Sequence, residues 1–163
     1  MIPSDHFVRF YNEVFKFLDE KGGLEAYYEE ISRHQDFHCL KEFRERKLQG
    51  VYDYYLKIRK EENCDLDIIL NGKELVLVMN KCPSLSKAID NDAGPCKKYC
   101  LHCPGWTAPL YRRAGLYQVF DIMGLDNPQC AEWLYEDLED ARRKYRELLK
   151  TRPAEMLGIN FEA

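Results

Sequence analysis

The residue pair Asn71-Gly72 constrains the fold more than any other feature of the sequence. It separates two runs of β-prone residues, L-D-I-I-L from residue 66 and K-E-L-V-L-V-M from residue 73. Asn-Gly between such runs is the strongest short-range signal for a β-hairpin, because both residues tolerate the backbone angles of a tight turn. Two later runs, 117–122 and 130–135, indicate a second hairpin around the turn-rich sequence G-L-D-N-P. The sequence therefore predicts a four-stranded antiparallel sheet built from two hairpins.

Helices are predicted on both sides of these hairpins. Apolar residues recur at helical spacing through residues 1–63, and Gly22-Gly23 and Gly50 divide that part into three helices. A further helix over 136–150 begins with acidic residues and ends with basic ones, which suits the helix dipole. Between the hairpins lies a cysteine-rich segment that is expected to be partly helical.

This order of elements indicates the fold class. Strands and helices do not alternate regularly enough to imply a parallel sheet, so we predict an α+β fold. We expect a single domain over 1–163 that comprises a helical part (1–63), a sheet and cysteine-rich part (64–150) and a tail (151–163). For the tail the sequence predicts no structure.

The composition indicates which classes of partner are not expected for this protein. Of the 163 residues, 45% are apolar and 32% are charged, as in a globular protein rather than a disordered one. The net charge is −4 and basic residues are interspersed with acidic ones, so neither nucleic acid nor an anionic membrane is an expected partner. The first ten residues lack a signal-peptide pattern. We therefore expect a cytoplasmic protein whose thiols stay reduced.

The segment 81–106 concentrates the chemistry of the chain. It holds four of the seven cysteines at the spacing C-x13-C-x3-C-x2-C: Cys82, Cys96, Cys100 and Cys103. Four thiolates can hold zinc or an iron–sulfur cluster, and we predict these four as metal ligands. Reduced thiols lining a pocket for a small molecule, or inert packing of small buried side chains, are the other interpretations. Cys39 and Cys64 have no partners at metal spacing and are predicted to be packing residues.

Histidines and arginines supply the other candidates. His34 and His38 are spaced as in the zincin motif H-E-x-x-H, but Gln35 replaces its glutamate, so we expect both to face the core. With His102 they are the candidates for a catalytic base. Arg112 and Arg113 follow the cysteine segment and could bind the carboxylate of a substrate, although only one of two adjacent helical residues would face a pocket.

Several short motifs resemble the L-2-amino-thiazoline-4-carboxylic acid hydrolase family over the C-terminal two-thirds of the chain. They are V-x-x-K-C-P at 78–83, Y-C at 99–100, Gly115 before a strand, and Cys130 at the start of the last strand. The resemblance implies a hydrolase that opens a small cyclic amide-like ring, with Cys82, Cys100 and Cys130 at matching positions and Cys130 as a candidate for substrate binding. Cys96, Cys103 and the sequence C-A-E-W at 130–133 depart from the family pattern. A metal-binding or ligand-binding domain and a thiazoline-type hydrolase are thus the two functions predicted.

Overall fold

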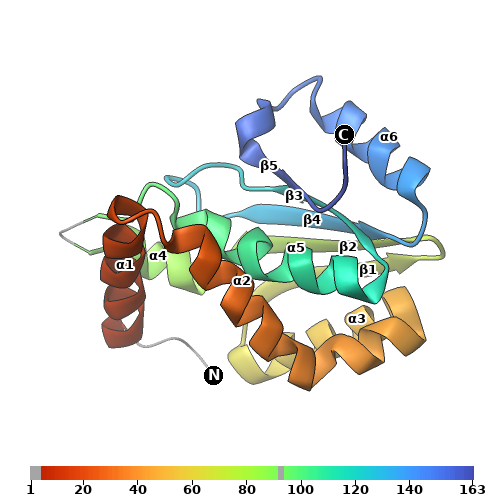
Figure 1. Cartoon of the computed structure of the whole chain (residues 1–163), viewed down its shortest axis with the longest axis horizontal. Helices are drawn as coiled ribbons and strands as arrows, with labels where there is room; N and C mark the ends of the chain where they lie inside the picture. Colours follow the sequence, from red (N-terminus) through yellow and green to blue (C-terminus); the bar gives the residue numbers. More distant parts are fainter. Residues whose placement is uncertain (1–4, 92–93) are drawn as a thin grey trace.

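The computed structural model describes residues 5–91 and 94–163, and it has an α+β fold in which helices precede one antiparallel sheet (Figure 1). The predicted class and the helical first part are confirmed. The sheet has five strands in the order β1-β2-β4-β3-β5, so the predicted count of four is wrong by one. The additional strand, β5 (Leu157–Ile159), lies in the tail for which no structure was predicted, and it pairs with β3.

The first part of the chain consists of α1 (Asp5–Glu20), α2 (Leu24–Gln35), a π-helical turn (Asp36–Leu40) and α3 (Lys41–Glu62). The break predicted at Gly50 occurs instead at Lys47, whose φ is 51°. Gly50 has a different role, because a Cβ there would lie 2.8 Å from the carbonyl oxygen of Glu42. The glycine lets the second half of α3 cross closely over the first half.

The predicted hairpins are both present. Strand β1 (Asp65–Asn71) pairs with β2 (Glu74–Lys81), and Asn71 lies opposite Glu74. The connecting residues are therefore Gly72 and Lys73, with Gly72 at a φ of 59°. Strand β3 (Tyr117–Asp121) pairs with β4 (Cys130–Tyr135), which also pairs with β2. Strand β4 is consequently the central strand of the sheet.

Helices cover both faces of this sheet (Figure 1). The remaining helices are α4 (Pro83–Ile89), α5 (His102–Ala114) and α6 (Leu138–Leu148), with short 3-10 turns at Tyr99–Leu101 and Ala154–Met156. Helix α3 packs on β1 and β2, and α5 packs on both α3 and β3, whereas α6 packs on β3 and β4. None of the helices in the described ranges is long and apolar enough to cross a membrane.

The two-residue period of β4 assigns its side chains to these faces. Trp133 and Tyr135 belong to the core cluster with Ala141 of α6. Leu134 belongs to the larger cluster that α3 and α5 build with β1 and β2. Because side chains alternate along a strand, Cys130 and Glu132 lie on the same face as Leu134. The sheet therefore presents a thiol and a carboxyl group beneath α5.

Candidate active site

A cavity of about 260 Å³ lies between α3, the start of α5 and the face of the sheet that carries Cys130 and Glu132. Its lining contains four thiols, from Cys64, Cys82, Cys103 and Cys130. Aromatic walls come from Tyr55, Trp106 and Phe120, and polar groups from His102, Thr107 and Glu132. An apolar cavity with a few convergent polar groups is the usual form of a small-molecule site, and this one is just smaller than the ~300–1,000 Å³ of typical pockets.

A second, much smaller void of about 20 Å³ lies against the same residues. It is bounded by Cys82, Cys100, Cys103 and Cys130, which come from the start of α4, a 3-10 turn, α5 and β4. All four are free thiols. Burial raises the pKa of Cys100 to about 12, and burial together with the neighbouring cysteines raises the pKa of Cys103 and Cys130. At neutral pH these thiols are protonated.

Cys96, the remaining predicted metal ligand, is absent from the lining of both spaces. Its side chain packs in the cluster under α1, and its backbone N–H donates to Oδ1 of the buried Asn12 at 2.7 Å. The structure therefore brings Cys130 to the position that Cys96 was predicted to take. Among the residues that the structure describes, no group of three or more His, Cys, Asp or Glu side chains has an arrangement that could hold a metal ion.

His102 and Cys103 form a pair at the start of α5. The Nδ1 atom of His102 lies in hydrogen-bond contact with the carbonyl oxygen of Tyr99, which can only accept, so Nδ1 carries a proton. Burial lowers the pKa of His102, so the ring is neutral and its Nε2 is an acceptor. Nε2 lies 3.3 Å from the Sγ atom of Cys103. A thiol beside an imidazole that a third group orients is the arrangement of a cysteine nucleophile with its general base.

The ring of His102 is held in place by an aromatic frame. Its centroid lies 5.1 Å from that of Trp106, 5.2 Å from that of Tyr99 and 5.6 Å from that of Phe15 on α1. Helix α1 thus takes part in orienting a histidine that lies far from it in the sequence. The packing restricts the ring to the orientation in which Nε2 faces the thiol.

Glycine sets the position of α5. A Cβ on Gly105 would lie 2.5 Å from the ring of Tyr28, so only a glycine lets α5 approach α2 this closely. Pro104 precedes it in the first turn of α5, where a missing backbone N–H is tolerated. The sequence C-P-G-W therefore fixes where the His102–Cys103 pair sits above the sheet.

Glu132 is the carboxyl group of the cavity. It is only 5% exposed and lies on the central strand between Leu77 of β2 and Phe120 of β3. Burial raises the pKa of Glu132 to about 7, and a hydrogen bond from Gln118 opposes that rise. The negative charge of an ionised Glu132 raises the pKa of the Cys103 thiol further. A carboxyl group that titrates near neutral pH in a cavity is suited to exchanging protons with a ligand.

A chain of hydrogen bonds positions Glu132. The Thr107 hydroxyl donates to the carbonyl oxygen of Cys103 at 2.8 Å, so it can only accept from Gln118. The Gln118 amide nitrogen donates to Thr107 at 2.8 Å and also to Oε1 of Glu132. This assignment leaves the carbonyl oxygen of the Gln118 side chain buried without a partner in the described residues. These hydrogen bonds link the backbone of Cys103 to the carboxyl group of Glu132.

The expectation that His34 and His38 face the core is wrong, because both are exposed. His34 lies 3.7 Å from Glu30 on the surface of α2, with 70% of its side chain exposed. The buried face runs through Leu24, Tyr28, Ser32 and Cys39, and His34 and His38 lie off it, two positions after Ser32 and one before Cys39. Neither histidine lines the cavity, so His102 is the one predicted base that does.

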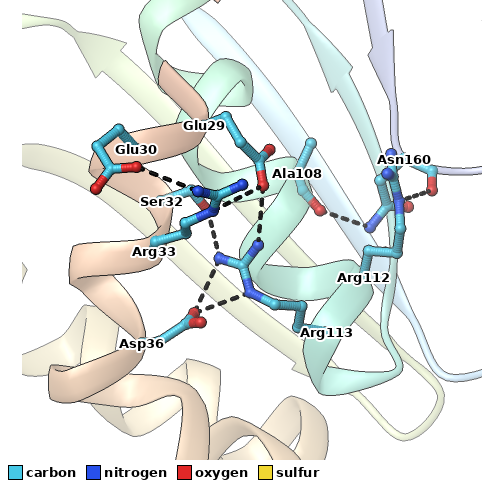
Figure 2. A network of polar contacts seen from close by, with 9 residues as sticks. All are labelled: Glu29, Glu30, Ser32, Arg33, Asp36, Ala108, Arg112, Arg113 and Asn160. Carbon is cyan, nitrogen blue, oxygen red and sulfur yellow. Dashed lines mark hydrogen bonds and ion pairs between the residues drawn. The ribbon is translucent and has the colours of Figure 1, made fainter. Parts of the chain in front are cut away.

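The structure gives the two predicted carboxylate-binding arginines other partners (Figure 2). Arg113 donates to Asp36 at 2.9 Å and to the Ser32 hydroxyl at 2.7 Å, which joins α5 to the end of α2. Arg112 donates to the backbone carbonyl of Asn160 at 3.1 Å. Neither residue lines the cavity. The arginines hold α5 to its neighbours.

The sequence did not predict that Cys64 and Glu132 line the cavity. Cys64 packs against the core near α3, as predicted, but it also lines the cavity, whereas Cys39 is buried in that core as expected. Glu132 drew attention only as a departure from a family pattern. The available signal was its place between Ala131 and Leu134 in a strand of buried residues, where an acidic side chain is unusual.

A scan against models of protein families, a search of curated proteins and a search of solved structures each gave no match. The resemblance to the thiazoline hydrolase family therefore stays a prediction.

Proposed function

We propose that this protein is a thiol-dependent hydrolase that acts on a small cyclic amide-like molecule. The observation that carries the proposal is the pair of Cys103 Sγ and His102 Nε2 at 3.3 Å, facing the cavity that also contains Glu132. Nucleophile, base and acid then lie around one space of about 260 Å³. A nucleophile, a base held in one tautomer and a carboxyl group that titrates near neutral pH are the parts that covalent hydrolysis needs.

The chemistry assigns one role to each group. Sγ of Cys103 attacks the electrophilic carbon while Nε2 of His102 takes the thiol proton. Protonated Glu132 gives its proton to the ring atom that leaves that carbon, which opens the ring. Water then attacks the enzyme-bound carbon, His102 and Glu132 exchange the remaining protons, and Cys103 leaves as a thiol. One molecule of water is consumed and the protein returns to its starting state.

The neutral imidazole is consistent with this sequence of steps. Burial keeps the thiol of Cys103 protonated, so the attack cannot rely on a thiolate that already exists. Burial also lowers the pKa of His102, so its Nε2 is free to accept a proton at neutral pH. Base-assisted attack is therefore the route that fits the protonation states of the pair.

A hydrolysis assay tests the proposal. The protein is incubated with 2-amino-thiazoline, 2-amino-thiazoline-4-carboxylate and simple lactams of similar size, and the products are examined by mass spectrometry for the gain of one water. We expect at least one compound to be hydrolysed, with the rate lost in Cys103→Ala and retained in Cys39→Ala, whose cysteine lies in the core near α3. Equal rates in Cys103→Ala and the unaltered protein, or no hydrolysis of any compound, would contradict the proposal.

The metal or iron–sulfur centre predicted from the sequence is the second candidate function. The void bounded by the thiols of Cys82, Cys100, Cys103 and Cys130 favours it, with Cys130 in place of Cys96. Four thiols are a donor set that zinc accepts, but their present arrangement does not fit a metal ion. Elemental analysis of anaerobically purified protein distinguishes the candidates, because a metal held by Cys103 would remove the nucleophile. About one equivalent of zinc, or several of iron, would favour the metal centre.

A further inference from the structure

Two of the four thiols around the small void lie one helical turn apart. The sequence C-L-H-C places Cys100 in the 3-10 turn (Tyr99–Leu101) and Cys103 in the first turn of α5. A 3-10 helix has about three residues per turn and rises about 2 Å per residue, so side chains three positions apart eclipse and their Cα atoms lie about 6 Å apart. Both residues line the void of about 20 Å³. The local backbone therefore directs the two thiols to the same space.

A disulfide between Cys100 and Cys103 fits this backbone, because disulfides join Cα atoms that lie about 4.4–6.8 Å apart. The other two thiols of the void are held by separate elements. Cys82 accepts a hydrogen bond from the Leu85 N–H at 3.4 Å at the start of α4, and Cys130 lies on the central strand. A bond from Cys103 to either would have to draw α5 toward that element, whereas a bond to Cys100 needs only side-chain rotation.

Cys100 can also be approached from the surface. It lines a hollow of about 250 Å³ whose rim includes the exposed side chains of Lys97 and Glu155. Among the residues that the structure describes, Cys100 alone lines both this hollow and the void. A small solute can therefore reach Cys100 from the hollow, while Cys103 faces the cavity on the other side of the void.

We infer that Cys100 and Cys103 form a redox modification site, at which a hydroperoxide converts the two thiols into a disulfide. Both thiols are free in the structure, which therefore shows the reduced form. The effect on catalysis rests on the proposed function, because the disulfide would remove the proposed nucleophile. A neighbouring thiol makes the modification reversible, since a sulfenic acid that condenses with a thiol does not proceed to the irreversible sulfinic acid.

The base proposed for hydrolysis also serves the oxidation. Nε2 of His102, 3.3 Å from Sγ of Cys103, takes the thiol proton as the sulfur attacks an oxygen of the hydroperoxide. The S–O bond forms, the O–O bond breaks, and the proton passes to the departing oxygen, which leaves as water or an alcohol. The sulfur of Cys100 then attacks that of Cys103, the S–O bond breaks, and the hydroxyl group leaves as water with the proton of Cys100. The thiols lose two electrons and the hydroperoxide gains them.

Peptide mapping of the oxidised protein tests this inference. Reduced protein is treated with hydrogen peroxide, the remaining thiols are blocked with N-ethylmaleimide in denaturant, and the protein is digested with trypsin without reductant. Cleavage after Lys98 and Arg112 gives the peptide 99–112, which contains Cys100 and Cys103 and no other cysteine. We expect this peptide to lack maleimide adducts and to be lighter than the reduced peptide by two hydrogen atoms. Treatment with dithiothreitol before blocking should restore both adducts.

Three results would overturn the inference. The first is a pair of peptides joined through Cys82 or Cys130, and the second is a sulfinic acid at Cys103 beside an unreacted Cys100. The third is a peptide 99–112 that keeps both adducts at a peroxide concentration that oxidises free cysteine.

Matched variants assign the reversibility to Cys100. In the unaltered protein, peroxide should block the alkylation of Cys103 by chloroacetamide in proportion to the disulfide formed, and dithiothreitol should restore it. The same recovery is expected in Cys130→Ala, which removes another thiol of the void. In Cys100→Ala the oxidation of Cys103 should continue to the sulfinic acid, so dithiothreitol should not restore alkylation. Full recovery in Cys100→Ala, or loss of recovery only in Cys130→Ala, would overturn the inference.

The outcomes also separate this inference from the proposed function. If the disulfide forms but the reduced protein hydrolyses no compound, or if hydrolysis continues at full rate in the disulfide form, the inference stands and the hydrolase proposal falls. If hydrolysis depends on Cys103 and peroxide gives no disulfide between Cys100 and Cys103, the hydrolase proposal stands and the inference falls.

Discussion

Replacement of Glu132 by glutamine should change how stability depends on pH. The folded state raises the pKa of Glu132 from its ordinary value of about 4.5 to about 7 by burying it. Between these values the unfolded chain has lost the proton and the folded chain has kept it, so the unfolded state is favoured as pH rises. At about 1.4 kcal/mol for each pH unit, this interval removes about 3.5 kcal/mol of stability, nearly all of it lost by about pH 8.

The change Glu132→Gln removes this titration and leaves every other group in place. The difference in unfolding free energy between the variant and the unaltered protein should therefore shift by about 2.5 kcal/mol, in favour of the variant, from pH 5 to pH 8. Urea unfolding at several pH values measures both curves. Parallel curves would mean that burial does not hold the proton on Glu132.

Two further substitutions test the packing that places the site. Gly105→Ala puts a Cβ 2.5 Å from the ring of Tyr28 and should lower the unfolding free energy by about 1–3 kcal/mol, measured by urea unfolding; an unchanged midpoint would contradict the close approach of α5 to α2. Arg113→Gln removes the hydrogen bonds to Asp36 and Ser32 and should lower it by about 1 kcal/mol, whereas Arg33→Gln, whose side chain is 64% exposed, should have little effect. Equal effects of the two arginine variants would contradict the role assigned to Arg113.

Local sequence signals were sufficient for most of the fold. The hairpin at Asn71-Gly72 was predictable because turn chemistry and β-prone runs act over a few residues. Strand β5 was not, since the three residues L-G-I form a strand only by pairing with β3. The exposure of His34 and His38 was missed because a polar residue, Ser32, lies on the buried face with Leu24 and Tyr28, and the pattern of apolar residues does not indicate this.

The candidate site was likewise predictable only where the local spacing of residues determines it. The spacing of cysteines pointed to the segment 81–106, which does supply Cys82, Cys100 and Cys103 to one void. Spacing could not show that Cys130 arrives from the central strand, or that Asn12 holds Cys96 under α1. Those placements depend on contacts between residues far apart in the chain. Glu132 belongs to the same class, because its pKa is raised by a burial that only the folded sheet provides.

The pH dependence of Cys103 alkylation shows whether His102 acts as the base for this thiol. Chloroacetamide is the agent, and peptide mass spectrometry follows Cys103 separately from the other six cysteines. If His102 acts as the base, the rate should be nearly constant from about pH 6.5 to pH 8.5, because the lowered pKa of His102 leaves it neutral throughout. In His102→Gln the rate should be slower and rise about tenfold for each pH unit, as for a thiol that must ionise alone. A tenfold rise per pH unit in the unaltered protein, with no effect of His102→Gln, would show that His102 does not act as the base for Cys103.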